Sequence, residues 1–179
     1  PRVQRQANGE DVWVSGERVI ARTGIHSARK LKVPFDKRDL PGTPLLNYDN
    51  CEKGIWEPYA RLKDYDANGV DAGVLFPDFL PGFTGNPFWS LDHDPELRME
   101  CLKAWNDWEV EDFCSVSPNR LISQCLLPVW DVKESVKELA RCAKKGHKGV
   151  TIGGVLDIFG YPTFFEPHWD PIWEAAQEL

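Results

Sequence analysis

The chain has 179 residues, 42% of them hydrophobic and 12% aromatic, and a formal net charge of -7 at pH 7, which fits one globular domain with a buried core. The acidic balance offers no basic surface for nucleic acid or an anionic membrane. No run of about 18 apolar residues could span a bilayer, and the first residues lack the apolar core of a signal peptide, so we expect a soluble chain with neither partner.

The first 55 residues are predicted to be largely irregular. The stretch VWVSGERVI, residues 12 to 20, alternates around Ser15 and Gly16, which indicates a small β-hairpin. From Trp56 onward, helices alternate with short apolar strands. The predicted elements are a helix at 58–68, a strand at 72–76, a helix from 95 to about 118, a strand at 121–127, a helix at 131–146, a strand at 149–154 and a helix from 170.

Two of these helices carry clear start signals. Asp94 and Pro95 suit the N-cap and the first helical position, and Asp131 with Glu134 three residues later has the spacing of a capping box. Gly146 suits the end of that helix. The strands do not alternate cleanly, as is typical of strands buried on both faces, so the order α-β-α-β-α-β-α predicts a parallel sheet covered by helices.

Two architectures share this order, the closed (β/α)8 barrel and the open doubly wound sheet. No G-x-G-x-x-G and no Walker-type loop follows a strand, which disfavours the nucleotide-binding open sheet. A full barrel takes about 250 residues, so three strands predict only part of a TIM barrel. We expect residues 1–55 to be an insertion after a missing first strand and residues 56–179 to be the βα units of one incomplete domain. The start at Pro1 and the absence of a helix stop before Leu179 fit a segment cut at both ends.

The cysteines indicate a reduced, cytoplasmic setting. They form no C-x-x-C pair. All but Cys51 fall in predicted helices or strands, where thiols usually pack as small hydrophobes. The five are Cys51, Cys101, Cys114, Cys125 and Cys142.

Five stretches form a family pattern: RLKDYDANGVDAGVLFP (61–77), KAWNDWEVEDFCSVSPNRL (103–121), LLPVWD (126–131), GHKGV (146–150) and DPIWEAAQEL (170–179). In this order they resemble the amidohydrolase-related (amidohydrolase 2) group of metal-dependent hydrolases. That group includes aminocarboxymuconate semialdehyde decarboxylase and related aromatic-acid decarboxylases. Tyr65 and Trp105 stand where the pattern more often has Met and Tyr, a change of packing rather than of chemistry.

The resemblance implies a (β/α)8 barrel with a divalent metal, usually zinc, at the strand ends. Such enzymes hold the metal with an H-x-H on the first strand, a histidine ending the fifth and an aspartate ending the eighth. None of these positions matches here, because the visible strands would be the second to the fourth. The histidines of this chain are also too isolated to form a ligand set: His26, His93, His147 and His168. We therefore expect the metal ligands outside this segment and no cofactor within it.

Chemistry in parallel α/β folds collects at the carboxyl ends of the strands. By this rule the substrate-binding candidates are Asp78 and Phe79 after the first visible strand, Trp130 after the second, and His168 before the last helix. Asp78 is as readily a turn residue, and a lone histidine more often packs or lies at the surface. The aromatic loop at 78–91 could line a substrate pocket, cover the barrel mouth or contact a second subunit. No catalytic residue is identified.

Three further residues are given structural interpretations. The capping duty of Asp131 already accounts for its carboxylate. Lys148 precedes its strand, which argues against a carbamylated metal-bridging lysine. Asn106 lies on a long helix and is expected to satisfy backbone groups in a neighbouring loop.

Two functions of different class remain open. The first is a metal-dependent hydrolase or non-oxidative decarboxylase acting on a small carboxylated substrate, with an aromatic acid as one option. The resemblance implies that a zinc-type ion polarises the substrate and activates water in the full-length protein, and that this segment alone is inactive. The second is a self-standing, non-catalytic α/β module that binds a ligand or partner. Related barrels are often dimers, so a homodimer stays an option.

Overall fold

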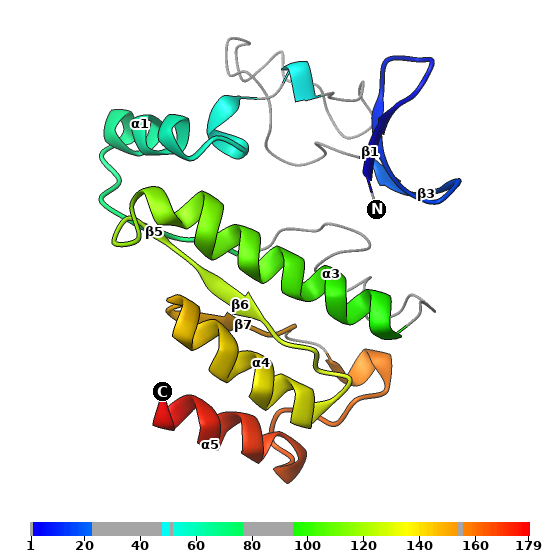
Figure 1. Cartoon of the computed structure of the whole chain (residues 1–179), viewed down its shortest axis with the longest axis vertical. Helices are drawn as coiled ribbons and strands as arrows, with labels where there is room; N and C mark the ends of the chain where they lie inside the picture. Colours follow the sequence, from blue (N-terminus) through cyan, green and yellow to red (C-terminus); the bar gives the residue numbers. More distant parts are fainter. Residues whose placement is uncertain (1, 23–47, 51, 77–94, 154–155) are drawn as a thin grey trace. The chain divides into compact units, whose positions relative to one another are not determined.

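A computed structural model describes residues 2–22, 48–50, 52–76, 95–153 and 156–179 (Figure 1). The chain forms two compact units, Pro1–Asp64 and Tyr65–Leu179. Within the described ranges, no helix combines the length and the apolarity needed to cross a bilayer.

The first unit contains a three-stranded antiparallel sheet. Its strands are β1 (Arg2–Arg5), β2 (Asp11–Ser15) and β3 (Arg18–Arg22), with β2 in the middle. Gly16 has φ 57°, a left-handed conformation that glycine adopts without strain, and it turns the chain between β2 and β3 where the sequence predicted a hairpin. Val12 and Val14 are buried in this sheet. The strand β1 was not predicted, and all four of its side chains are exposed.

The second unit contains short parallel strands in chain order. β4 (Gly73–Val74) pairs with β5 (Leu121–Ile122), and β6 (Gln124–Leu126) pairs with β7 (Gly149–Thr151). The break between β5 and β6 is the single residue Ser123, so the predicted strand at 121–127 is one run that pairs with β4 through its first half and with β7 through its second. The parallel mixed α/β arrangement expected from the sequence is confirmed.

The helices begin and end close to the predicted positions. They are α1 (Pro58–Asn68), α3 (Pro95–Trp108), α4 (Val132–Lys145) and α5 (Asp170–Glu178). A π-helical turn (Glu109–Phe113) and a 3-10 turn (Cys114–Val116) prolong α3. Further 3-10 turns are Tyr48–Asn50, Lys53–Ile55, Leu156–Phe159 and Pro167–Trp169.

Local capping explains the bounds of α4. The Asp131 carboxylate accepts hydrogen bonds from the backbone N–H groups of Lys133 and Glu134 at 3.0 and 3.1 Å. At the other end, Gly146 closes the helix with φ 108°. The structural interpretation of Asp131 as an N-cap is confirmed.

The core of the second unit lies between the strands and the helices. Leu102 of α3, Leu127 after β6, and Trp169 and Ile172 around α5 are almost completely inaccessible to solvent. Burial of each such side chain stabilises the fold by about 1.5–3 kcal/mol. The cysteines in the described ranges are free and buried, as the interpretation of small hydrophobes requires: Cys101, Cys114, Cys125 and Cys142.

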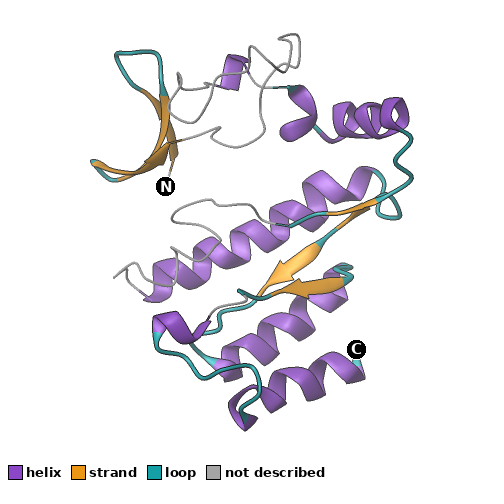
Figure 2. Cartoon of the chain, turned by 180° about the vertical axis from the view of Figure 1, so that it is seen from behind, coloured by secondary structure: helices purple, strands orange, loops and turns teal. Residues whose placement is uncertain are grey.

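Helices cover one face of the strands more fully than the other. Figure 1 shows α3 and α4 in front of the strands, and in Figure 2, turned by 180°, the strands lie in front of these helices. Leu121 and Cys125 are buried beneath the helices. Val74, which pairs with Ile122 and so faces the other side, is 46% exposed, and Phe76 is 65% exposed.

Candidate functional site

The carboxyl ends of the parallel strands meet the starts of the helices at one end of the second unit. β6 ends at Leu126 and leads through Leu127, Pro128 and Val129 to Trp130, just before α4. The first residues of α3 lie at the same end, toward which the arrowhead of β6 points (Figure 1). Because ligands of parallel α/β folds bind at this edge, the Trp130 segment is a described part of the chain that could line a binding site.

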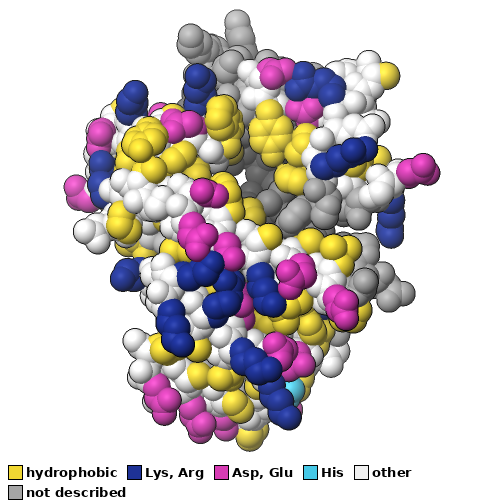
Figure 3. All heavy atoms as spheres, in the orientation of Figure 1, with side chains coloured by type: hydrophobic (Ala, Val, Ile, Leu, Met, Phe, Trp, Pro, Cys, Tyr) yellow, Lys and Arg dark blue, Asp and Glu magenta, His cyan; other side chains and the backbone are white. Residues whose placement is uncertain are grey.

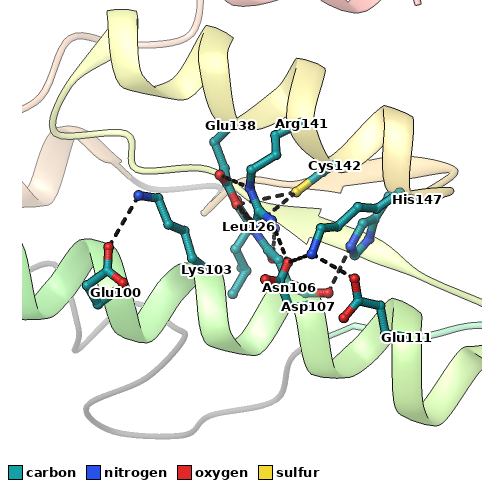
Figure 4. Close-up of polar contacts among 11 residues, drawn as sticks. Glu100, Lys103, Asn106, Asp107, Glu111, Leu126, Glu138, Arg141, Cys142 and His147 are labelled. Atoms are coloured by element: carbon teal, nitrogen blue, oxygen red, sulfur yellow. Dashed lines mark hydrogen bonds and ion pairs between the residues drawn. The ribbon is translucent and has the colours of Figure 1, made fainter.

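A buried amide fixes the end of β6 (Figure 4). Asn106 of α3 is completely buried. Its Oδ1 accepts a hydrogen bond from the Leu126 N–H at 2.8 Å, and its Nδ2 donates to the Leu126 carbonyl at 3.0 Å and to Glu138 Oε1 at 2.7 Å. The side chain thus takes the place of a neighbouring strand. The prediction that Asn106 satisfies backbone groups is confirmed, although those groups belong to a strand rather than a loop.

Glu138 of α4 is the buried charge beneath this amide. It is 3% exposed, and Arg141 donates to both of its carboxylate oxygens at 2.7 Å. Burial by itself raises the pKa of Glu138, but hydrogen bonds from Arg141, Asn106 and the Cys142 thiol outweigh that effect and hold the pKa below its usual range. Glu138 is therefore an ionised carboxylate with its partners in place.

The cluster continues outward to solvent. Asp107 contacts Arg141 and Lys145, and Lys145 also contacts Glu111 at 2.7 Å. On the face seen in Figure 3, Lys and Arg side chains alternate with Asp and Glu side chains over α3 and α4. These exposed pairs contribute little each, whereas the buried part of the cluster ties α3, β6 and α4 together.

The segment after β6 is also held from α4. Ser135 is completely buried, and its hydroxyl donates to the Pro128 carbonyl at 2.9 Å. Together with the two bonds from Asn106 to Leu126, this contact fixes the backbone on the path to Trp130. The buried polar cluster therefore supports the candidate site without being part of it.

Trp130 itself carries a cation over its ring. The guanidinium carbon of Arg98, in the first turn of α3, lies 4.1 Å from the ring centroid. Both side chains are half-buried. This cation–π contact joins the start of α3 to the end of β6 at the candidate edge. The order of the elements predicts Trp130 at this edge, whereas Arg98, 32 residues earlier in the chain, carries no local signal of the contact.

The remaining predicted substrate residues stay predictions. Asp78 and Phe79 lie outside the described residues, as do His26 and His93. His168 is exposed and packs edge-on against Trp169, with ring centroids 4.6 Å apart. That contact bears on packing, not on substrate.

Two buried titratable groups lie away from the candidate edge. His147, which precedes β7, is 8% exposed and has Nε2 3.0 Å from the Asn106 carbonyl oxygen, and burial lowers its pKa. Glu109, in the π-helical turn, is 2% exposed, and burial raises its pKa to about 8 against the opposing effect of a backbone hydrogen bond from Gln124. Both groups are held neutral at pH 7.

The described residues do not fit a metal centre. Across them, no three His, Cys, Asp or Glu side chains converge into a group that could hold an ion. The divalent metal implied by the family resemblance therefore matches no donor set here, and no reaction step is assigned to it within this chain.

No family model matches the chain. The curated 2-amino-3-carboxymuconate-6-semialdehyde decarboxylase of Dictyostelium discoideum is 26% identical over 133 residues, which is 74% of this chain and 34% of that protein. The chain thus spans about a third of the length of this relative. The similarity confirms the resemblance to the amidohydrolase-related enzymes that the sequence motifs indicated.

The solved structures that resemble the chain include an amidohydrolase and a decarboxylase. An amidohydrolase from Mycobacterium avium subsp. paratuberculosis is 20% identical with a TM-score of 0.61, and the match covers 98% of this chain and 48% of that one. A 5-carboxyvanillate decarboxylase from Novosphingobium aromaticivorans, solved with bound manganese, is 27% identical with a TM-score of 0.49, covering 66% of this chain and 31% of that one. The first match shows that the chain shares the fold of about half an amidohydrolase.

Proposed function

We propose that this chain is part of a metal-dependent enzyme of the amidohydrolase type that removes carbon dioxide from a small, aromatic or otherwise unsaturated carboxylic acid. The observation that carries the proposal is the match to a decarboxylase over 133 residues, which is 74% of this chain. Hydrolysis by the same kind of site is the competing reaction.

The fold supports this proposal. β4, the β5–β6 run and β7 are parallel and pair in chain order, as the second, third and fourth strands of a (β/α)8 barrel would. Val74 and Phe76 lie exposed on the face away from the helices, where a barrel would place its interior. In this assignment the metal ligands lie on strands outside these 179 residues.

This chain would then contribute one wall of the substrate site. The Trp130 segment lies at the carboxyl ends of the strands and is held by buried hydrogen bonds at Leu126 and Pro128. Its task is to bind and orient the substrate, since the described residues supply neither a metal donor set nor an assigned nucleophile.

The test is turnover by the full-length protein that contains this chain. With zinc or manganese supplied, we expect carbon dioxide release from carboxylated aromatic or muconate-type acids, followed by manometry or by loss of ultraviolet absorbance. The 179-residue chain alone should show no turnover and bind metal well below stoichiometry. Tight stoichiometric zinc in this chain, or amide or ester hydrolysis without carbon dioxide release, would contradict the proposal.

A further inference from the structure

We propose that Ser135 is a positioning residue for the reaction, which acts by fixing the chain between β6 and α4. That connection is the Trp130 segment, residues 127–130, and its part in substrate binding rests on the proposed function. The inference goes further by giving a kinetic role to one buried hydroxyl group of this chain. Ser135 acts through the Pro128 carbonyl rather than by contact with the substrate.

The Trp130 segment lies where a shift of the backbone matters to a ligand. It starts after β6 ends at Leu126, and it leads to α4, which begins at Val132. Connections from the carboxyl end of a parallel strand to the next helix are where these folds bind their ligands. Residues 127–129 are buried, so the helices that pack on them set the shape of this edge from behind.

The Ser135 hydroxyl joins this connection to its own helix. Ser135 is completely buried, and its hydroxyl donates to the Pro128 carbonyl at 2.9 Å. The same carbonyl accepts a hydrogen bond from the Asp131 N–H at 2.8 Å, and the Ser135 N–H donates to the Asp131 carbonyl at 2.9 Å. These three bonds close the connection onto the start of α4, so the position of Pro128 follows that of Ser135.

The start of the connection is fixed from the other helix. Asn106 of α3 bonds to both the N–H and the carbonyl of Leu126, and the Val129 N–H donates to the Leu127 carbonyl at 2.9 Å. Two polar side chains, one from α3 and one from α4, therefore hold the two halves of the path. Because these backbone groups bond within the chain, they contribute to a site through the shape that they impose.

The role of Ser135 in position can be separated from a role in stability. Without its hydroxyl, the Pro128 carbonyl keeps the Asp131 N–H, so no buried acceptor is left unsatisfied. Ser135→Ala should therefore fold and yet hold the Trp130 segment more loosely. A displacement of about 1 Å far from the reacting atoms can slow a reaction about 100-fold, and a loose segment must also be ordered when the ligand binds.

The experiment uses the full-length protein with zinc or manganese, and the probe acids are salicylate and muconate. For an acid that wild type decarboxylates, Ser135→Ala should lower kcat/KM about 3- to 30-fold. The loss should include a raised KM, because a smaller folded fraction would lower the apparent kcat and leave KM unchanged. The urea midpoint should move by less than about 0.5 M.

Hydrogen exchange measures the position of the segment independently of turnover. In Ser135→Ala, the amides of Val129 and Asp131 should exchange about 10-fold faster than in wild type, because the bonds that they make belong to the loosened connection. Unchanged exchange at both amides would overturn the inference, since the hydroxyl would then not fix the segment.

Two further variants serve as controls. Ser135→Cys keeps the volume of the side chain and has only a weak donor, so it should behave like Ser135→Ala. Wild-type kinetics in Ser135→Cys would show that volume rather than the hydrogen bond matters, and would overturn the inference. Ser115→Ala removes a hydroxyl that bonds to the Asp112 carbonyl at 3.1 Å in the turn before β5, at the opposite end of the strands. It should match wild type in kinetics and in exchange, and an equal loss would also overturn the inference.

The outcomes separate this inference from the proposed function. If wild type and Ser135→Ala decarboxylate an acid with the same kcat/KM and KM, the positioning role is wrong and the function stands. If wild type releases carbon dioxide from neither acid, the proposed function is wrong, and the kinetic role of Ser135 is wrong with it. A lower kcat/KM with a raised KM and faster exchange supports both.

Discussion

Asn106 uses both N–H donors and its carbonyl oxygen on two partners that are themselves buried, Leu126 and Glu138. Such a side chain does more for stability than its size suggests, because each partner group lacks an alternative in water. The loss of one buried partner costs about 1–3 kcal/mol per polar group left unsatisfied.

We therefore predict that Asn106→Ala lowers the free energy of unfolding by about 3–5 kcal/mol, since it strands two backbone groups and weakens the environment of a buried charge. Urea unfolding followed by circular dichroism measures the change. The control is Asn119→Ala, at an exposed turn position, which should change stability by less than about 0.5 kcal/mol. Equal effects of the two substitutions would show that the buried amide has no special role.

Glu138 makes the acid side of the stability profile steep. Its pKa in the folded chain lies below the ordinary value, so ionised Glu138 stabilises the fold above that value, and this stability is lost as the pH falls through the folded pKa. Glu138→Gln should be less stable than wild type at neutral pH, and the gap should narrow on acidification. Urea midpoints from about pH 7 to 3 test this, and a constant gap would contradict it.

The contribution of Glu109 to the pH dependence of stability has the opposite sign. Burial raises its pKa to about 8, so the unfolded chain ionises first, and the stability present below about pH 4.5 is lost progressively as the pH rises to the folded pKa. The substitution Glu109→Gln removes this loss of stability at higher pH. Its melting temperature should match wild type near pH 4.5 and exceed it near pH 8. Thermal scans at both values are the measurement, and an equal difference from wild type at the two pH values would contradict the prediction.

At the scale of elements, α4 owes its start to one side chain. Asp131→Ala removes two hydrogen bonds to the first turn and should destabilise the chain by about 1 kcal/mol. Asp131→Ser should restore most of that loss, because a hydroxyl caps as well as a carboxylate does. A loss in both variants would mean that the charge, rather than the cap, is needed. Chemical unfolding measures the three proteins side by side.

The elements that the sequence predicts well are those with local signals. Pro95, Asp131 and Gly146 mark helix ends through contacts within a few residues, and the structure confirms them. β1 was missed because RVQR has no buried side to create a pattern. Ser135 and Glu138 are polar, yet they are buried in α4 beside Leu139 and Cys142. Their partners lie on α3 and after β6, and no local pattern encodes contacts that distant.

The same division applies to the candidate site. Trp130 could be placed at the strand ends from element order alone, because a parallel fold dictates which loops share an edge. The position of the Arg98 guanidinium above Trp130 could not be predicted in this way, since tertiary packing brings these two residues together from distant parts of the sequence. The substrate roles of Asp78, Phe79 and His168 remain predictions.

At the scale of the whole molecule, the side of the parallel strands that faces away from α3 and α4 exposes apolar side chains. Val74 of the short strand β4 is 46% exposed, and Phe76, two residues later, is 65% exposed. The 179-residue chain should therefore self-associate as its concentration rises, and Phe76→Lys or Val74→Lys should suppress this. Tyr59→Lys, at a 62% exposed aromatic on α1, should not. Sedimentation velocity gives the answer, and a monomer at all concentrations would contradict the prediction.

Ser123 divides one run of chain between two neighbours, with β4 beside its first residues and β7 beside its last. The strands β4 and β7 are therefore staggered along the run that lies between them. A sheet that closes into a barrel requires a stagger of this kind between neighbouring strands. A one-residue insertion at Ser123 would shift the register of β6 relative to β5 and so misalign the pairing that follows with β7.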